Sequence, residues 1–146
     1  MRRSRAMKIL SLIFCLFVAF SNADVLRIDS QEVVIDANNK LMWQDSRDVE
    51  RVSQDLQGAR AYCANLSFAG HSDWRLPIMD DLFSIRDEKR ANIAINTAFK
   101  NVIPKNYWSS SNVYDSGYAW SMNFENGDDS LQLKNSNFYV RCVRDN

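Results

Sequence analysis

The placement of three cysteines limits the folds open to this chain more than any other feature. Cys15 lies within the first 23 residues, so only Cys63 and Cys142 belong to the rest of the chain. In an oxidising compartment, an even pair of cysteines favours a disulfide over a metal site. A bond between the two would close a loop of about 80 residues and stabilise a small domain by roughly 4–5 kcal/mol in the chain-entropy model. If the chain is exported, the sequence therefore predicts that these two distant segments meet.

The first 23 residues have the composition of a secretory signal peptide. An apolar run over residues 9–20 is preceded by the basic residues Arg2, Arg3, Arg5 and Lys8. The run is shorter than the ~20 residues that a bilayer-spanning helix needs, and it ends in a segment, 21–23, that suits a cleavage site. We expect cleavage after Ala23, which leaves no membrane anchor. The protein would then be bacterial, and periplasmic or secreted.

Residues 24–146 have the length of one domain, and their charge argues against a nucleic-acid partner. The first 23 residues hold four of the 18 basic residues and none of the 18 acidic ones. The remaining 14 basic and 18 acidic residues give a net charge of −4. Binding to a nucleic acid backbone relies on clustered cations, and the longest basic cluster in this segment is Lys89-Arg90. We expect no nucleic-acid partner.

The first half of this domain carries hairpin and helix signals. Two β-prone runs, 32–36 and 40–44, flank the turn-forming residues 37–39 and predict a β-hairpin. Ser53 can cap a helix that extends to about Ser67. Apolar residues recur at helical spacing on one face of this helix, at Leu56, Ala59, Cys63 and Leu66. The side chain of Cys63 is therefore expected to point inward.

A second helix is predicted to begin at Pro77 and to end near Arg90. Proline is favoured in the first turn of a helix, and Leu82 and Ile85 form a short apolar stripe after it. The segment 91–106 has apolar residues without a clean period, which fits either a partly buried loop or a further short helix.

The last third of the chain predicts an antiparallel β-meander. Strand-like residues at 107–111 and 118–124 lead into Asn126-Gly127, a strong signal for a tight turn. Apolar side chains alternate along the predicted strands, at Trp120, Met122 and Phe124, at Leu131 and Leu133, and at Phe138, Val140 and Cys142. The disulfide would then join the first helix to the final strand. The predicted fold class is α+β, with two main helices packed on antiparallel sheet.

Six short motifs occur in a characteristic order along the chain. They are Leu41-Met42-Trp43-Gln44, Ala61-Tyr62-Cys63, Asp73-Trp74-Arg75-Leu76-Pro77, Tyr107-Trp108-Ser109-Ser110-Ser111, Ala119-Trp120 and Tyr139-Val140-Arg141-Cys142-Val143-Arg144. In this order the motifs resemble the Lcl C-terminal domain family, which is named for the terminal domain of a collagen-like adhesin. The resemblance covers roughly residues 33–144. It implies a C-type-lectin-like fold, related to that of the formylglycine-generating enzyme. It also implies a disulfide from Cys63 to Cys142 and a role in binding or adhesion.

Metal and cofactor sites are not expected. In a calcium-dependent lectin, carboxylate and carbonyl oxygens complete the cation's ligand cage, and Lys105 places a cation where such an oxygen is needed. Asn126, Asp128 and Asp129 supply oxygens, but a solvated hairpin tip explains them better. We therefore predict no metal and no cofactor.

Catalytic groups are also sparse, so we predict that the protein is not an enzyme. His71 is the only histidine, and it lies in a loop. The serines at 109–111 fit a structural role in a turn. Asp80 and Asp81 are adjacent and would point about 100° apart on a helix, so they cannot form a dyad. An enzyme of the formylglycine-generating type would need reactive thiols, which the predicted disulfide consumes.

The aromatic residues divide into an expected core set and an expected surface pair. Four tryptophans lie inside the shared motifs and are predicted to be core, namely Trp43, Trp74, Trp108 and Trp120. In contrast, Tyr114 and Tyr118 lie in a polar segment with Asn112 and Asp115, and tyrosine among such residues suits recognition of a sugar or a peptide. A role in covering the edge of the core is equally compatible with the two tyrosines.

The leading hypothesis from the sequence is an exported, non-catalytic module that binds a glycan or a protein ligand through Asn112, Tyr114, Asp115 and Tyr118. Two alternatives stay open. The chain could be an accessory subunit of a cell-envelope assembly, with an envelope protein as its partner. An enzyme of the formylglycine-generating type is the less favoured alternative.

Overall fold

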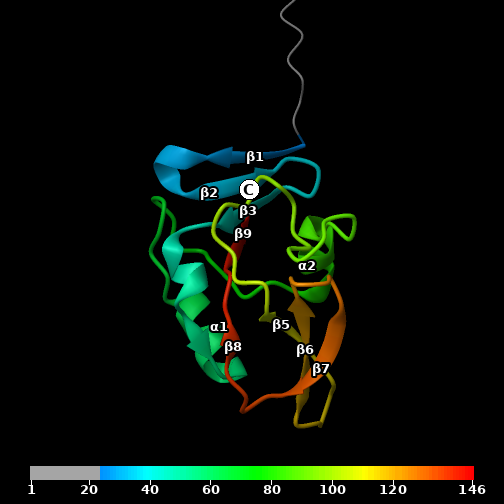
Figure 1. The fold of residues 1–146 in the computed structure, drawn as a ribbon. Helices are drawn as coiled ribbons and strands as arrows, with labels where there is room; N and C mark the ends of the chain where they lie inside the picture. Colours follow the sequence, from blue (N-terminus) through cyan, green and yellow to red (C-terminus); the bar gives the residue numbers. More distant parts are fainter. Residues whose placement is uncertain (1–23) are drawn as a thin grey trace, which may run out of the picture.

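The computed structural model describes residues 24–146, and the predicted signal peptide at 1–23 lies outside them. These residues form two sheets and two α-helices, so the predicted α+β class is confirmed (Figure 1). The first sheet has the order β1-β2-β3-β9, with β1 at Val25–Ile28, β2 at Val33–Asp36, β3 at Leu41–Gln44 and β9 at Val143–Asp145. The second has the order β4-β8-β5-β6-β7, with β4 at Ser53–Gln54, β8 at Phe138–Tyr139, β5 at Asn106–Asn112, β6 at Tyr118–Asn123 and β7 at Asp129–Leu133. The helices are α1 at Leu56–Ala64 and α2 at Met79–Ile85, with short 3-10 helices at Asp29–Gln31 and Arg47–Glu50.

The predicted hairpin near the N-terminus is confirmed as β2 and β3. The two strands pair antiparallel from Val33 opposite Gln44 to Asp36 opposite Leu41. The buried Asp36 carboxylate accepts hydrogen bonds from the Asn39 backbone N–H (3.1 Å) and side-chain amide (2.8 Å). These bonds fix the turn, since an aspartate side chain readily replaces a backbone acceptor there.

The predicted bounds of the first helix are wrong at both ends. Ser53 does not cap α1, because Ser53–Gln54 is strand β4 and pairs with β8. The cap is Asp55, whose carboxylate accepts a 2.7 Å hydrogen bond from the Gly58 N–H. The helix ends at Ala64, three residues before Ser67. Leu56, Ala59 and Cys63 are buried, which confirms the predicted apolar face.

The second helix is shorter than predicted. Its start is close to expectation, because α2 begins at Met79, two residues after Pro77, and Leu82 and Ile85 are fully buried. The helix ends at Ile85 rather than near Arg90, because Arg86 is extended and forms a bridge with the buried Ile95. The segment 91–106 has no helix and follows the partly buried loop alternative. No helix within residues 24–146 is long and apolar enough to cross a membrane.

The predicted meander is confirmed as β5, β6 and β7. Strand β6 pairs antiparallel with β5 and with β7. The predicted two-residue turn at Asn126-Gly127 is wrong: the Asn123 N–H donates to the Asp128 carbonyl (2.8 Å), so residues 124–127 form the turn. Within it, Gly127 occupies the left-handed region (φ 80°). Glycine suits this position because it has no Cβ to clash with the backbone. Of the alternating apolar residues, Met122 and Phe124 are buried, whereas Leu131 and Leu133 remain exposed.

The predicted final strand is divided between the two sheets. Strand β8 joins the second sheet and β9 joins the first, so residues 140–142 cross from one sheet to the other. Cys142 lies in this crossing segment rather than in a strand. It forms the predicted disulfide with Cys63 of α1, with the two Cα atoms 5.5 Å apart. The bond therefore attaches α1 to the junction of the sheets.

Two apolar clusters fill the interior. One packs α2 between the sheets around Trp43, and the other surrounds the disulfide and includes Trp74 and Trp108. These three tryptophans are buried, as predicted, while Trp120 is only half-buried at the margin of the first cluster.

A buried ion pair joins the crossing segment to the end of β3. The guanidinium of Arg141 is fully buried and donates to Asp45 Oδ1 (3.0 Å) and to the Gln44 carbonyl (2.7 Å). The Asp45 carboxylate also accepts from the Lys100 N–H (2.9 Å) and from the side chain of Arg27. Desolvation lowers the pKa of Arg141 to about 10, so this side chain stays charged at neutral pH. A buried charge with this many partners is held in one position.

Replacing Asp45 with asparagine should strongly destabilise the fold. The Asp45→Asn side chain keeps the size but leaves the buried Arg141 charge without its counterion, which costs about 3–5 kcal/mol when one partner of a buried pair is removed. Chemical denaturation gives the free energy of unfolding. Asp73→Asn is the matched control, because Asp73 forms its ion pair with Arg144 at the surface. Equal losses in the two variants would contradict a special role for the buried pair.

Candidate ligand-binding groove

The loop between β5 and β6 presents two of the predicted ligand-binding residues to solvent. Tyr114 is 88% exposed, and Asp115 is exposed with a left-handed backbone (φ 50°). The loop is closed by Ser116, whose N–H donates to the Val113 carbonyl (3.2 Å) and whose hydroxyl accepts from the Tyr118 N–H (3.2 Å). These bonds hold Tyr114 at the tip of a defined turn.

The other two predicted residues lie on opposite faces of the sheet. Asn112 is directly opposite Ala119, which packs in the apolar cluster beside α1. Side chains alternate along a strand, so Tyr118, the residue before Ala119, points to the face that carries α2. Tyr118 is opposite Leu133 there. The structure therefore brings Asn112 near the side of α1 and separates it from Tyr118.

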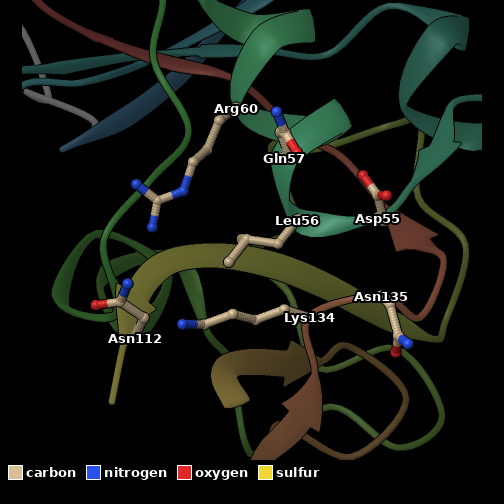
Figure 2. Close-up of a pocket in the computed structure, with 7 residues that line it drawn as sticks. All are labelled: Asp55, Leu56, Gln57, Arg60, Asn112, Lys134 and Asn135. Atoms are coloured by element: carbon tan, nitrogen blue, oxygen red, sulfur yellow. The ribbon is translucent and has the colours of Figure 1, made fainter. Parts of the chain in front are cut away.

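A groove of about 430 Å³ lies beside Asn112, between the start of α1, the end of β5 and the turn after β7 (Figure 2). Its lining residues are Asp55, Leu56, Gln57, Arg60, Asn112, Lys134 and Asn135. Figure 2 shows that the side chains of Arg60, Asn112 and Lys134 point toward one end of the groove, while Asp55 and Asn135 lie at the other end. The groove thus has a donor-rich end and an acidic end.

The first turn of α1 forms one wall of the groove. The Leu56 N–H donates to the Lys134 carbonyl (3.0 Å), which joins the helix to the turn after β7. The absence of a side chain at Gly58 lets Asp55 cap the helix closely, since a Cβ there would lie 3.1 Å from Asp55 Oδ1. Leu56 is buried at the base of the groove, and Gln57 and Arg60 are exposed one turn apart on its wall.

Two cations are fixed in the groove by backbone carbonyls. Arg60 Nη2 donates to the Ser110 carbonyl (2.9 Å), and Lys134 Nζ donates to the Ser116 carbonyl (2.6 Å). Each side chain keeps further N–H donors for a ligand. With Asp55 as the one carboxylate in the lining, the groove has a local positive charge although residues 24–146 carry −4 overall.

Most of this groove could not be predicted from the sequence. Asn112 alone was among the predicted residues. The spacing of Gln57 and Arg60 indicates a shared face of the first helix, and the alternation after Leu133 places Lys134 on the opposite side of its strand. However, no local pattern connects these segments with Asn112, because tertiary packing alone brings them together.

Several of the serines and aspartates that could have been catalytic form hydrogen bonds and ion pairs within the fold. The buried Ser109 hydroxyl donates to the Trp120 carbonyl (2.7 Å), and Ser111 Oγ accepts from the Met79 N–H (3.0 Å). Asp80 is exposed, whereas Asp81 is buried and forms an ion pair with Arg75 (2.7 Å). No group of three or more histidine, cysteine or acidic side chains within residues 24–146 is arranged to hold a metal ion.

The groove wall should depend on Asp55 rather than on Ser53. Loss of a helix-capping side chain costs about 1 kcal/mol, so Asp55→Ala should lower the free energy of unfolding by about that amount. Ser53→Ala is the matched control, because Ser53 is exposed in β4 and should change stability by less than about 0.5 kcal/mol. Chemical denaturation of both variants measures the difference. A larger loss in Ser53→Ala would show that the helix begins earlier than described.

Comparison with known protein families gives one match over most of the chain. The model of a family described as the Lcl C-terminal domain matches residues 32–144. This segment includes α1, the groove residues and both disulfide-bonded cysteines. No curated protein matches the chain.

Proposed function

The chain belongs to the Lcl C-terminal domain family, and from this premise we propose that it is an exported, non-catalytic module that binds a glycan through the groove. The observation that carries the proposal is the convergence of Arg60, Asn112 and Lys134 at one end of the groove (Figure 2). All three offer N–H donors to the same small volume. Hydroxyl and carboxylate oxygens of a sugar are suitable acceptors for such donors.

The remaining groove surface supports the same ligand class. Sugar rings combine polar edges with apolar C–H faces, and the groove combines the amides of Gln57 and Asn135 with the apolar Leu56. Tyr114 lies two residues beyond Asn112, in the turn between β5 and β6. Lys134 donates a hydrogen bond to the Ser116 carbonyl of this turn. Its exposed ring offers a flat surface for apolar contact together with a hydroxyl. A glycan that occupies the groove could therefore extend over this turn.

The proposal includes a C-type-lectin-like fold. Three features support it: a helix early in the domain, a disulfide from that helix to the last segment, and the pairing of the C-terminal strand β9 with the N-terminal hairpin. In this fold the calcium-dependent sugar site lies in a long-loop region, but the groove we propose has cationic donors instead of a carboxylate cage. Binding should therefore be independent of calcium.

The absence of catalysis is part of the proposal. Cys63 and Cys142 are bonded to each other, which removes both thiols that a reaction of the formylglycine-generating type would need in this part of the chain. The Ser109 hydroxyl is buried and donates to a backbone carbonyl, so it is not free to act as a nucleophile. The role of an accessory subunit in an envelope assembly remains the second proposal, and an exposed apolar strip on β6 and β7 favours a protein contact.

Glycan-array binding by the oxidised protein, at physiological salt with and without a chelator, tests the proposed ligand class. We expect binding that survives chelation and that weakens at least about tenfold in Arg60→Ala, because a hydrogen bond to a charged group contributes about 1.5–3 kcal/mol. Tyr114→Ala should weaken binding several-fold.

Two variants serve as matched controls for this experiment. Arg47→Ala removes an exposed arginine that does not line the groove, and Tyr118→Ala removes the tyrosine on the opposite face of the sheet. Both should bind like the unmodified protein. Failure of the oxidised protein to bind any glycan would contradict the proposal, as would an equal loss in Arg60→Ala and Tyr118→Ala.

A further inference from the structure

Strand β7 is the edge of the second sheet, and within residues 24–146 no strand pairs with its outer side (Figure 1). Two backbone hydrogen bonds show which residues of this segment bond to β6. The Asn123 N–H donates to the Asp128 carbonyl, and the Lys134 N–H donates to the Gly117 carbonyl (both 2.8 Å). In an antiparallel ladder the bonded residues alternate. The backbone groups of Asp129, Leu131 and Leu133 therefore point outward along the edge.

The same edge carries exposed apolar side chains on one face. Leu131 is 42% exposed and Leu133 is 48% exposed, and their partners on β6 are Trp120 and Tyr118. Tyr118 is 46% exposed and Trp120 is half-buried. An open strand edge beside apolar side chains is a template for pairing with another strand.

One face of this segment, which carries Asp128 and Lys134, is complementary to itself in charge. Residues 128–134 read Asp-Asp-Ser-Leu-Gln-Leu-Lys, with Leu131 at the centre. When two copies run antiparallel with Leu131 opposite Leu131, Asp128 of each copy is opposite Lys134 of the other. Directly opposed residues share a face of the sheet, so two opposite-charge pairs form, one at each end of the contact.

We propose that the chain forms a symmetric dimer in which β7 of one copy pairs antiparallel with β7 of a second copy in this register. The outward backbone groups match it, because Leu131 would bond to Leu131 and Asp129 to Leu133 across the two-fold axis. The Leu133 carbonyl already accepts a hydrogen bond from the Ser136 N–H (2.9 Å). Without the Leu133 carbonyl, about four backbone hydrogen bonds can still form between the two copies. They use outward backbone groups of β7 that do not bond to β6.

A second copy fits this edge better than an unrelated extended peptide does. The Asp128 and Lys134 positions select for a strand with the opposite order of charges, and an antiparallel copy of β7 has that order. Lys134 keeps its hydrogen bond to the Ser116 carbonyl of its own copy, and its charge attracts Asp128 of the other copy without a direct hydrogen bond. The two Leu131 side chains would contact each other on the face that carries Tyr118, and Leu133 of each copy would be opposite Asp129 of the other.

The dimer has a consequence for ligand binding. A two-fold axis through paired edge strands makes one continuous sheet, so the faces that carry Lys134 lie on the same side in both copies. The two grooves would then face one direction and could bind one polymeric ligand together, which raises the apparent affinity without any new contact. The dimer itself does not rest on the proposed glycan ligand.

Charge reversal tests the dimer by sedimentation velocity on oxidised protein produced from the complete chain. The unmodified protein should sediment as a dimer that dissociates on dilution. Asp128→Lys alone opposes lysine to Lys134, and Lys134→Asp alone opposes aspartate to Asp128, so each variant should be monomeric. An equimolar mixture of the two variants restores both opposite-charge pairs and should again contain a dimer.

Two controls make the result specific to β7. Lys89→Asp reverses an exposed charge in the loop after α2 and should leave the dimer intact. Leu131→Lys changes an exposed side chain and places two cations together at the two-fold axis, so it should abolish the dimer. This variant tests the proposal independently of how well Lys134→Asp folds. An unmodified protein that is monomeric at every soluble concentration would overturn the proposal, as would a dimer in Leu131→Lys or a mixture that stays monomeric.

Discussion

The buried contact between Arg141 and Asp45 is the interaction on which the arrangement of the two sheets depends. The chain crosses from β8 to β9 at residues 140–142, and the fully buried Arg141 side chain bonds to both the Gln44 carbonyl and the Asp45 carboxylate at the end of β3. Moving the Arg141 side chain away from this position would leave a buried charge without its counterion, which is strongly unfavourable. The ion pair therefore holds the crossing segment against the end of β3.

The groove depends on the same junction through a short series of contacts. Cys142 follows Arg141 and holds α1 through its disulfide with Cys63. The first turn of α1 bonds through the Leu56 N–H to the Lys134 carbonyl, and Lys134 bonds to the turn that carries Tyr114. The proposed ligand-binding surface is thus built from loops on a rigid scaffold, which is the usual location of recognition residues.

The sequence predicts the local elements well where one side-chain pattern determines them. The hairpin around residues 37–39 and the apolar face of α1 each follow from neighbouring residues. The turn after β6 contains Asn126-Gly127 but spans residues 124–127, so it is longer than the two-residue turn that this pair predicts. Helix ends are predicted less well, because Ser53 could cap a helix by its chemistry but is instead paired in β4. Arg141 and the groove could not be predicted, since their partners are distant in sequence and only packing places them together. Tyr118 is a similar case. The polar segment predicted that Tyr118 and Asn112 belong to one binding surface, but the alternation of side chains along the strands places them on opposite faces of the sheet.

The central claim is that the groove beside α1 binds a glycan, and amide chemical-shift mapping tests it most directly. Isotope-labelled, oxidised protein would be titrated with an oligosaccharide that contains carboxylated sugars. The account predicts shifts at residues 56–60, 112–117 and 134–135, which line the groove or form the adjoining turn. Residues 104–106 and 137–139, at the other end of the sheet, should not shift. No shift at any ligand concentration, or shifts confined to that other end, would contradict the account.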